Sequence, residues 1–153
     1  MRAINHALTG AVIGFSISDP VIALPVAFLS HFALDAIPHF GMNGDADLLT
    51  RWFKVLLVVD ALLCVTLVAI LFAFHPTRWI AAACCAFLAA SPDLFSIGKF
   101  RLSLQTQHVP KNVSWFARFH GEDGIQWFQR PLGLAVELAW APAMVLLLVG
   151  LTR

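Results

Sequence analysis

The stretch FKVLLVVDALLCVTLVAILFAF, residues 53–74, constrains this chain more than any other, because it carries only two charged side chains, Lys54 and Asp60. A helix of about 20 predominantly apolar residues crosses the hydrocarbon core of a bilayer. Inside that core every backbone amide must be hydrogen-bonded within the protein, which a helix achieves within a single segment. These residues therefore predict a transmembrane helix and favour an all-α fold for the chain.

Composition extends this prediction from one segment to the whole chain. Hydrophobic residues make up 59% of the 153 residues and charged residues 12%, whereas a water-soluble domain carries about 25% charged residues. A chain of this length forms one domain, so we expect a single integral membrane domain over residues 1–153, with membrane lipid as its partner. The net charge of +1 provides no basic surface for nucleic acid, and no nucleic-acid partner is expected.

Four further apolar segments accompany residues 53–74 and predict a polytopic transmembrane bundle of about five helices. The second begins at a turn in which Ser18 or Asp19 caps the helix and Pro20 takes its first position. The first two segments are short for a bilayer, so they form either two spans or a re-entrant hairpin. The predicted helices cover residues 4–18, 20–37, 53–74, 78–97 and 131–151, and residues 98–130 form a cytoplasmic loop with an amphipathic segment.

Basic residues indicate how this bundle is oriented. With five crossings, or three crossings and a hairpin, eight Lys and Arg side chains fall on the N-terminal side of the membrane and two on the other. Cytoplasmic loops carry the excess of basic residues, so we expect a cytoplasmic N-terminus and an external C-terminus. The larger group is Arg2, Arg51, Lys54, Lys99, Arg101, Lys111, Arg118 and Arg130, and the smaller is Arg78 and Arg153.

A stripe of ionisable residues interrupts the second apolar segment, in the sequence SHFALDAIPHF. His31, Asp35 and His39 recur every four residues, a spacing that places helical side chains on one face, although Pro38 favours an end to the helix before His39. In the predicted topology this stripe shares one depth, near the cytoplasmic surface, with acids and imidazoles from the rest of the chain. The whole set is His6, His31, Asp35, His39, Asp60, Asp93, His120 and Glu137.

A shared cation would explain so many ionisable groups at one depth. Each acid at the centre of a transmembrane helix costs about 2.5–3.5 kcal/mol, and carboxylates and neutral imidazoles are natural ligands of divalent metals. Each group also has an ordinary interpretation. His31 and Asp35 could hold two helices together by a hydrogen bond, Asp60 or Glu137 could be protonated, and Asp93 could cap a turn.

Several segments resemble one protein family. NHALTGAVIG, LPVAFLSHFALDAIPHF, a transmembrane Asp, a PDL near a helix end and RFHGEDGIQWFQRPLGLAVEL are similar to segments of the small bacterial inner-membrane proteins known as membrane-bound metal-dependent hydrolases. The resemblance runs over nearly the whole chain and implies a location in the bacterial inner membrane. The metal ligands that it implies are His6, His31, Asp35, Asp93 and His120.

The residues and the resemblance together predict a membrane-embedded metal-dependent hydrolase that acts on a lipid or lipid-linked phosphate or ester near the cytoplasmic face. The predicted metal ligands are His6, His31, Asp35, His39, Asp93 and His120. Such a mixture suits Zn²⁺ best, with Mn²⁺, Fe²⁺ or a dinuclear centre as alternatives. The predicted catalytic carboxylates, one of them a general base, are Asp60 and Glu137. The predicted contacts to an anionic headgroup are Arg101, Arg118 and Arg130.

Two other functions stay open on the residues alone. A cation or proton-coupled transporter would use the same acids and imidazoles as a relay. Such a relay would continue toward the outer face, where residues 64–74 and 143–150 contain no acid, imidazole or basic side chain. This disfavours an open path through the protein but leaves a regulated path open. A non-catalytic membrane scaffold stabilised by metal would bind the ion without consuming a substrate.

Overall fold

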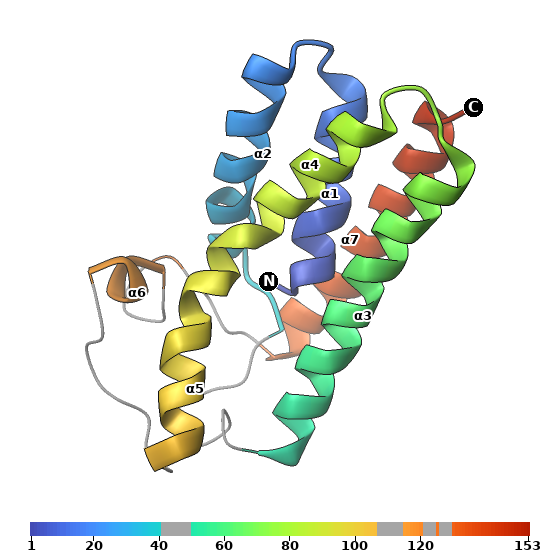
Figure 1. Ribbon diagram of the computed structural model, residues 1–153. Coiled ribbons are helices and arrows are strands. Elements are labelled where there is room, and N and C mark those ends of the chain that lie inside the picture. Colours follow the sequence, from blue (N-terminus) through green and yellow to red (C-terminus); the bar gives the residue numbers. More distant parts are fainter. Residues whose placement is uncertain (41–49, 107–114, 121–124, 126–129) are drawn as a thin grey trace.

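The computed structural model describes residues 1–40, 50–106, 115–120, 125 and 130–153, and within its helices residues 96, 99, 103, 117, 118 and 130 are described by their backbone alone. All regular elements of this described part are helices, which confirms the all-α prediction (Figure 1). In chain order they are α1 (Ala3–Ser16), α2 (Pro20–Asp35), α3 (Arg51–Phe74), α4 (Trp79–Ala90), the 3₁₀-helix η2 (Ser91–Ser96), α5 (Ile97–Thr106), α6 (Trp115–His120) and α7 (Arg130–Leu151).

Two of these helices, α3 and α7, are long and apolar enough to cross a membrane. The helices from Trp79 to Phe95 and from Phe100 to Thr106 would make a third span if they count as one helix bent by 43°. The 14 residues of α1 and 16 residues of α2 reach only about 21 and 24 Å at 1.5 Å per residue, short of a hydrocarbon core about 30 Å thick. Two to three of the described helices are thus long and apolar enough to cross a membrane, and a bundle of five transmembrane helices is not confirmed.

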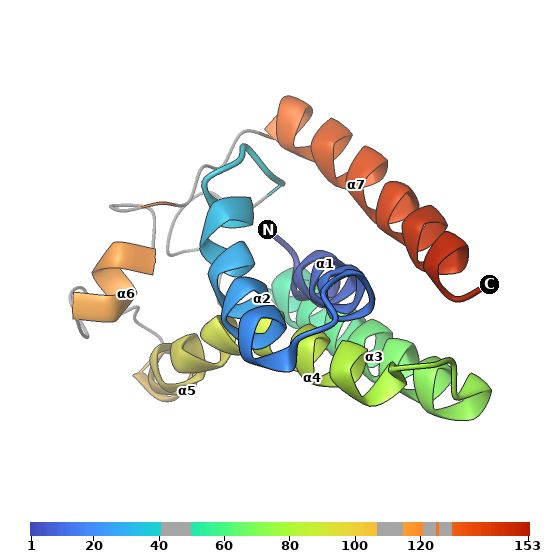
Figure 2. The ribbon, with the colours of Figure 1, turned by 90° about the horizontal axis from the view of Figure 1, so that it is seen from above.

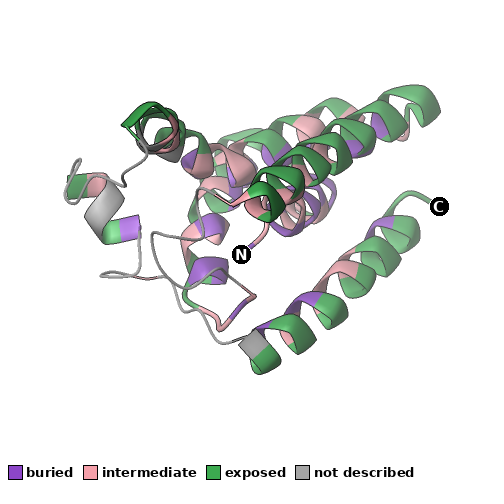
Figure 3. Ribbon diagram, turned by 90° about the horizontal axis from the view of Figure 1, so that it is seen from below, coloured by how far each residue is buried: buried purple, intermediate pink, exposed green. Residues whose placement is uncertain are grey.

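The exposed surface of the long helices fits this reading. Leu67 and Leu71 are the only buried residues of α3, and leucine, valine and phenylalanine side chains cover most of the rest of that helix in exposed positions. Exposed residues also cover most of the C-terminal helix α7 (Figure 3). Apolar surface on this scale is suited to lipid, because a water-soluble protein rarely exposes large contiguous apolar patches.

The predicted helix 78–97 is interrupted, and the reason is Pro92. A proline within a helix removes a backbone donor and clashes with the carbonyl group four residues earlier. The chain accordingly leaves the α-helix at Ala90 and tightens into η2, with Pro92 near its start. Helix α5 then follows directly, and with α6 it occupies part of the region expected as the 98–130 loop; residues 107–114, 121–124 and 126–129 of that loop lie outside the described residues.

Local capping rules predict the start of α2. The Asp19 side chain accepts a hydrogen bond from the backbone N–H of Val21 at 2.9 Å, and Pro20 is the first helical residue. This helix ends at Asp35, with Ala36 as its C-cap, before the proline at position 38. Helix α3 begins in the same manner, because Thr50 accepts from the N–H of Phe53.

Helix α1 lies at the centre of the molecule and packs closely against α4 (Figures 1 and 2). Gly10 and Gly14 face Cys85, Ala89 and Ala82 of that helix, which is the small-residue packing typical of membrane helix pairs. A Cβ atom on Gly10 would lie 2.3 Å from the carbonyl oxygen of Cys85, and one on Gly14 would lie 2.5 Å from the Cα atom of Ala82. The two backbones therefore approach as closely as glycine permits.

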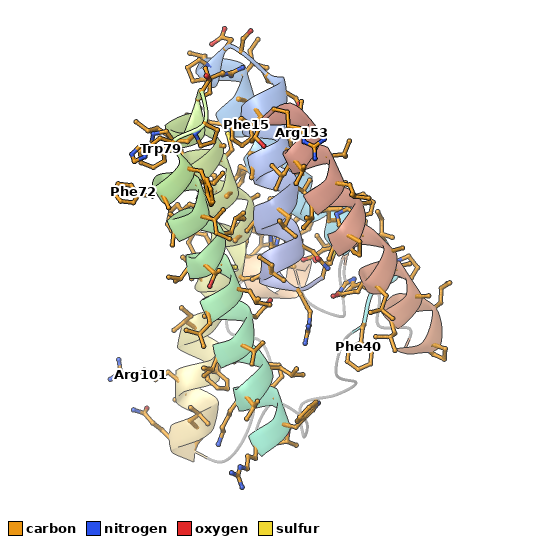
Figure 4. The ribbon with its side chains drawn as sticks, turned by 90° about the vertical axis from the view of Figure 1, so that its right-hand side faces the viewer. Phe15, Phe40, Phe72, Trp79, Arg101 and Arg153 are labelled. Carbon is orange, nitrogen blue, oxygen red and sulfur yellow. The ribbon has the colours of Figure 1, made fainter. Side chains whose placement is uncertain are left out.

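The far end of α1 is held by a basic side chain. The Arg78 guanidinium donates hydrogen bonds to the carbonyl groups of Phe15, at 3.2 Å, and of Ile17. Nearby, the rings of Phe72 and Trp79 meet edge to face at 5.6 Å and join the α3–α4 connection, as Figure 4 shows. These contacts fix α1, α3 and α4 at one end of the molecule, and the ionisable residues gather near the other end of α1.

Candidate metal centre

Helix α2 supplies two members of a buried ionisable cluster, His31 and Asp35. They lie one helical turn apart on one face, and His31 Nε2 is 3.2 Å from Asp35 Oδ2. The other ring nitrogen, Nδ1, lies 2.8 Å from the carbonyl oxygen of Ala89 in α4. Since a carbonyl oxygen only accepts, Nδ1 carries the proton, and in a neutral imidazole Nε2 presents a lone pair to the cluster. The Ala89 carbonyl group of α4 thus sets the orientation of the His31 ring.

His120 reaches the same cluster from α6, a helix of only six residues. Aromatic contacts hold this short helix against α2 and η2: the ring of Phe116 lies 5.1 Å from Phe95 and 6.2 Å from Phe32, and it stacks at 5.5 Å on His120 itself. The imidazole Nε2 of His120 then lies 2.9 Å from Asp35 Oδ2 and 2.7 Å from His31 Nε2. Apolar rings therefore surround the cluster on this side.

The fourth member is Asp93, in the first turn of η2. One carboxylate oxygen, Oδ1, lies 3.7 Å from His31 Nε2 and 3.9 Å from His120 Nε2. Together with Asp35, these residues offer four ligand atoms that all lie within 4.8 Å of one another. The side chains of His31, Asp35 and His120 are at most 4% exposed, but that of Asp93 is 34% exposed. The cluster is therefore closed on three sides and accessible at Asp93.

This arrangement could hold a metal ion. Four nitrogen or oxygen ligands placed tetrahedrally about 2.1 Å from a zinc ion lie about 3.4 Å apart. The distances that His31 and His120 make within the group, 2.7–3.9 Å, bracket that value, and all four ligand atoms lie within 4.8 Å. The two facing Nε2 atoms leave room for no more than one proton between them, so at least one presents a lone pair toward the carboxylates. A cation would turn these lone-pair contacts into favourable ones.

His6 lies beside the four-residue group and contacts Asp35 instead of completing the group. Its Nε2 lies 3.1 Å from Asp35 Oδ1, and its ring stacks on His31 with the centroids 4.0 Å apart. The amino group of Met1 also donates to Asp35 Oδ1. These contacts hold one oxygen of Asp35 and leave the other, Oδ2, directed at His31 and His120. His6 is placed to orient a ligand, and its predicted role as a ligand stays a prediction.

His39 is buried but is also not a member of the four-residue group. Its Nδ1 donates to the carbonyl oxygen of Ile37 at 2.8 Å, in the turn that follows α2. Burial lowers the pKa of His39 below the usual value for histidine, because the charged form loses its hydration. The neutral ring is therefore the favoured form of His39 in the folded protein.

The carboxylates of Asp60 and Glu137 contact the start of α1. Asp60 accepts hydrogen bonds from the backbone N–H groups of Ala3, at 2.8 Å, and Ile4, at 3.2 Å. Glu137 accepts from the N–H of Arg2 at 3.2 Å. The first N–H groups of a helix have no partner within the helix, and acids there also face the positive end of the helix dipole. Both carboxylates thus have a structural task, and their predicted catalytic role stays untested.

Of the three predicted headgroup contacts, the structure describes one side chain. Arg101 lies on α5 with its side chain exposed, as Figure 4 shows. The side chains of Arg118, in α6, and Arg130, at the start of α7, lie outside the described residues. The two backbones lie in the helix that carries His120 and the helix that carries Glu137, respectively.

Asn5 is a buried polar residue that the sequence interpretation passed over. Only 1% of its surface is exposed, and its side-chain N–H donates to Glu137 Oε2 at 3.0 Å. Its side-chain oxygen has no hydrogen-bond partner among the described residues, and neither does Nδ1 of His6. The available signal was the pair Asn5-His6 in an otherwise apolar first helix, since polar groups in such a helix face the protein interior.

No family model, curated protein or solved structure matches this chain. The fold and the cluster define the chain as a helical protein that has two to three helices long and apolar enough to cross a membrane and a His/Asp group that could hold a metal ion.

Proposed function

We propose that this chain is a metal-dependent hydrolase of the bacterial inner membrane that acts on a lipid or lipid-linked phosphate or ester. In this proposal His31, Asp35 and His120 bind Zn²⁺ near the cytoplasmic face of the membrane. The observation that carries the proposal is that the three ligand atoms lie close together and buried, whereas the Asp93 carboxylate lies further from them and is partly exposed. The uneven distribution of basic residues along the chain supports the orientation.

The three proposed ligands lie closer to one another than Asp93 lies to them. Nε2 of His31, Nε2 of His120 and Oδ2 of Asp35 are separated by 2.7–3.2 Å, whereas Asp93 Oδ1 is 3.7 and 3.9 Å from the two imidazoles. Structural zinc sites are closed by four protein ligands, but catalytic sites use three and leave one position open. Three close ligands beside a looser, partly exposed carboxylate support a catalytic site more than a structural one.

A divalent metal bound here would supply a Lewis acid that polarises a phosphoryl or acyl oxygen and activates water at neutral pH. Asp93, at the accessible edge, is placed to accept a proton as the general base. His31 keeps its ring orientation through Ala89, and His6 keeps that of Asp35. This assignment leaves the Asp60 and Glu137 carboxylates to hold the start of α1.

The surroundings of Asp93 support a lipid substrate. The next two side chains, Leu94 and Phe95, are 51% and 69% exposed, so the accessible acid is followed directly by exposed apolar groups. An acyl chain could contact these groups while the headgroup ester or phosphate meets the cluster. The exposed Arg101 of α5, the helix that follows η2, could bind an anionic headgroup.

Metal content provides the first test. We expect the purified protein in detergent, after incubation with Zn²⁺ and desalting, to retain about one zinc ion per chain by inductively coupled plasma mass spectrometry. H31A and H120A should lose it, since removal of one of three ligands weakens binding severely. His75→Asn is the matched control. His75 is the C-cap of α3 and does not belong to the cluster, and asparagine tolerates its positive φ of 43°. A wild-type protein without zinc would refute the proposal.

Hydrolysis provides the second test, with Asp93→Asn as the decisive variant. Mixed micelles containing a phosphatidic acid, a phosphodiester lipid and a carboxyl-ester lipid would be incubated with the zinc-loaded protein. If Asp93 is the general base, Asp93→Asn should keep its zinc and lose about 10²-fold or more in rate. Loss of zinc in Asp93→Asn, together with no hydrolysis by the wild type, would instead identify a four-ligand structural site and a scaffold.

A further inference from the structure

A cavity lies beside the first turn of α1, between α3 and α7. Its volume is about 600 Å³, within the range of about 300–1,000 Å³ that is typical of small-molecule sites. The apolar part of its wall includes Trp52, Leu56 and Leu63 of α3 and Leu134, Leu138 and Ala141 of α7. Phe40, which also lines it, lies between these two helices in the view of Figure 4. The cavity is thus mainly apolar.

The apolar wall follows the faces of two helices. Leu134, Leu138 and Ala141 recur at spacings of four and three residues, on one side of α7. On α3 the wall extends from Trp52 to Leu63, about 16 Å along the helix axis. Since α3 and α7 are the two helices able to span a membrane, the cavity lies between two surfaces that face lipid. An aliphatic chain can reach it from the bilayer.

The polar part of the cavity lining consists of Arg2, Asn5 and Glu137. The Asn5 side chain, 1% exposed, donates to Glu137, but its Oδ1 atom has no hydrogen-bond partner among the described residues. A buried acceptor without a donor is unfavourable, and a donor on a bound molecule would correct this. The guanidinium of Arg2 and the carboxylate of Glu137 offset each other in charge, which favours an uncharged donor.

We propose that this cavity binds a single-chain amphiphile, with its aliphatic chain between α3 and α7 and a hydroxyl or amide N–H of its polar head bonded to Asn5 Oδ1. The size of the cavity fits one chain and not a protein helix. The inference does not depend on hydrolysis or on the metal centre, because Asn5 and Glu137 lie outside the four-residue cluster. It assigns a ligand to Asn5 Oδ1, an unpaired acceptor that takes no part in the metal centre.

Two chain-matched probes test this proposal: N-dodecanoylethanolamine, which carries an amide N–H and a hydroxyl, and methyl dodecanoate, which carries neither donor. Binding to the full chain in detergent micelles would be measured by titration with native mass spectrometry. We expect the ethanolamide to bind about tenfold more tightly, the ratio for one hydrogen bond to a buried acceptor. In Asn5→Leu this preference should disappear, whereas in Ala141→Trp, which fills the apolar part, both probes should lose affinity.

Matched controls separate this site from lipid bound elsewhere. Val65 is a 65% exposed residue of α3 that does not line the cavity, and Val65→Trp should bind both probes as the wild type does. Asp93→Asn should do the same, so that failure of the proposed hydrolase leaves this result intact. Equal affinity of both probes for the wild type, or unchanged binding in Ala141→Trp, would overturn the proposal.

Discussion

The contact between α1 and α4 allows a quantitative test of how the fold positions the cluster. In Gly10→Ala the added methyl group would lie 2.3 Å from the carbonyl oxygen of Cys85 and 2.7 Å from the Cβ atom of Ala89. Overpacking of this kind costs about 1–3 kcal/mol, and the upper value applies because backbone atoms cannot rotate away. Alanine recovers about 1 kcal/mol of helix propensity. The expected net loss is therefore about 2 kcal/mol in the free energy of unfolding.

Gly150→Ala is the matched control for this substitution. Gly150 also lies within a helix, but a Cβ atom there would meet nothing within 4 Å. Because Gly150 lies in the last turn of α7, at most the propensity gain of about 1 kcal/mol then applies, so the two variants should differ by about 2–3 kcal/mol. Unfolding of the protein in dodecyl maltoside micelles by added sodium dodecyl sulfate, followed by circular dichroism, would measure this difference.

The same substitution should also affect metal binding. The carbonyl group of Ala89, which accepts the hydrogen bond from His31 Nδ1, lies in the part of α4 that Gly10→Ala pushes away from α1. We expect weaker retention of Zn²⁺ in Gly10→Ala and unchanged retention in Gly150→Ala. Equal unfolding midpoints for the two variants would refute the packing argument, and equal zinc retention despite unequal stability would refute the link from packing to the cluster.

Two further predictions concern polar groups near the cluster, the half-buried Asp60 and the buried His39. Asp60→Leu should lower the free energy of unfolding by about 1–3 kcal/mol, because the N–H groups of Ala3 and Ile4 lose their acceptor; Asp60→Asn, which keeps one acceptor oxygen, should lose less, and equal losses would contradict this reasoning. Because burial lowers the pKa of His39, the unfolded chain binds more protons below about pH 6.5. The stability of the metal-free protein should then fall as the pH drops below about 6.5, and the fall should be less steep in His39→Gln by up to about 1.4 kcal/mol per pH unit. Identical slopes in urea or detergent unfolding across pH 4.5–7.5 would refute it.

Local sequence signals were sufficient for the long helices and for the start of α2. The predicted segments 53–74 and 131–151 correspond to α3 and α7 within two residues at their ends, because length and hydropathy define a span without reference to its neighbours. Asp19 and Pro20 act as expected for the same reason. The number of spans could not be predicted in this way, since α1 and α2 are apolar but short and their packing decides how they are used.

The cluster shows where helical periodicity stops being informative. His31 and Asp35 share a face through their spacing alone, and the structure brings them together. His120 comes from a six-residue helix held by aromatic contacts to other elements, which no local pattern in the sequence specifies. The position of Asp60 within a long apolar helix was predictable, but the direction of its side chain was not. The competing donors were backbone N–H groups of α1, which hydropathy does not reveal.

The carboxylates near the start of α1 differ in how many donors and imidazoles the protein places beside their negative charge. This difference indicates where a cation is needed. Asp60 has two backbone N–H donors, Glu137 has one backbone donor and Asn5, and Asp35 has the Met1 amino group with three imidazoles. Within the described part of the chain, the nearest cationic or imidazole groups to Asp93 are the imidazoles 3.7 and 3.9 Å away.

Those two imidazoles can offset the negative charge of Asp93 only through a proton or a metal ion that lies between them and the carboxylate. The Nδ1–H group of His31 donates to the carbonyl oxygen of Ala89. When the ring is neutral, Nε2 therefore carries no proton to donate to Asp93. A bound cation would compensate Asp93 and at the same time attract Asp35, which is linked through His6 to α1. Metal binding should therefore stabilise the folded chain as well as the cluster, since a ligand that binds only the folded state raises its stability. The α1–α4 contact and the metal centre would then respond to the same ion.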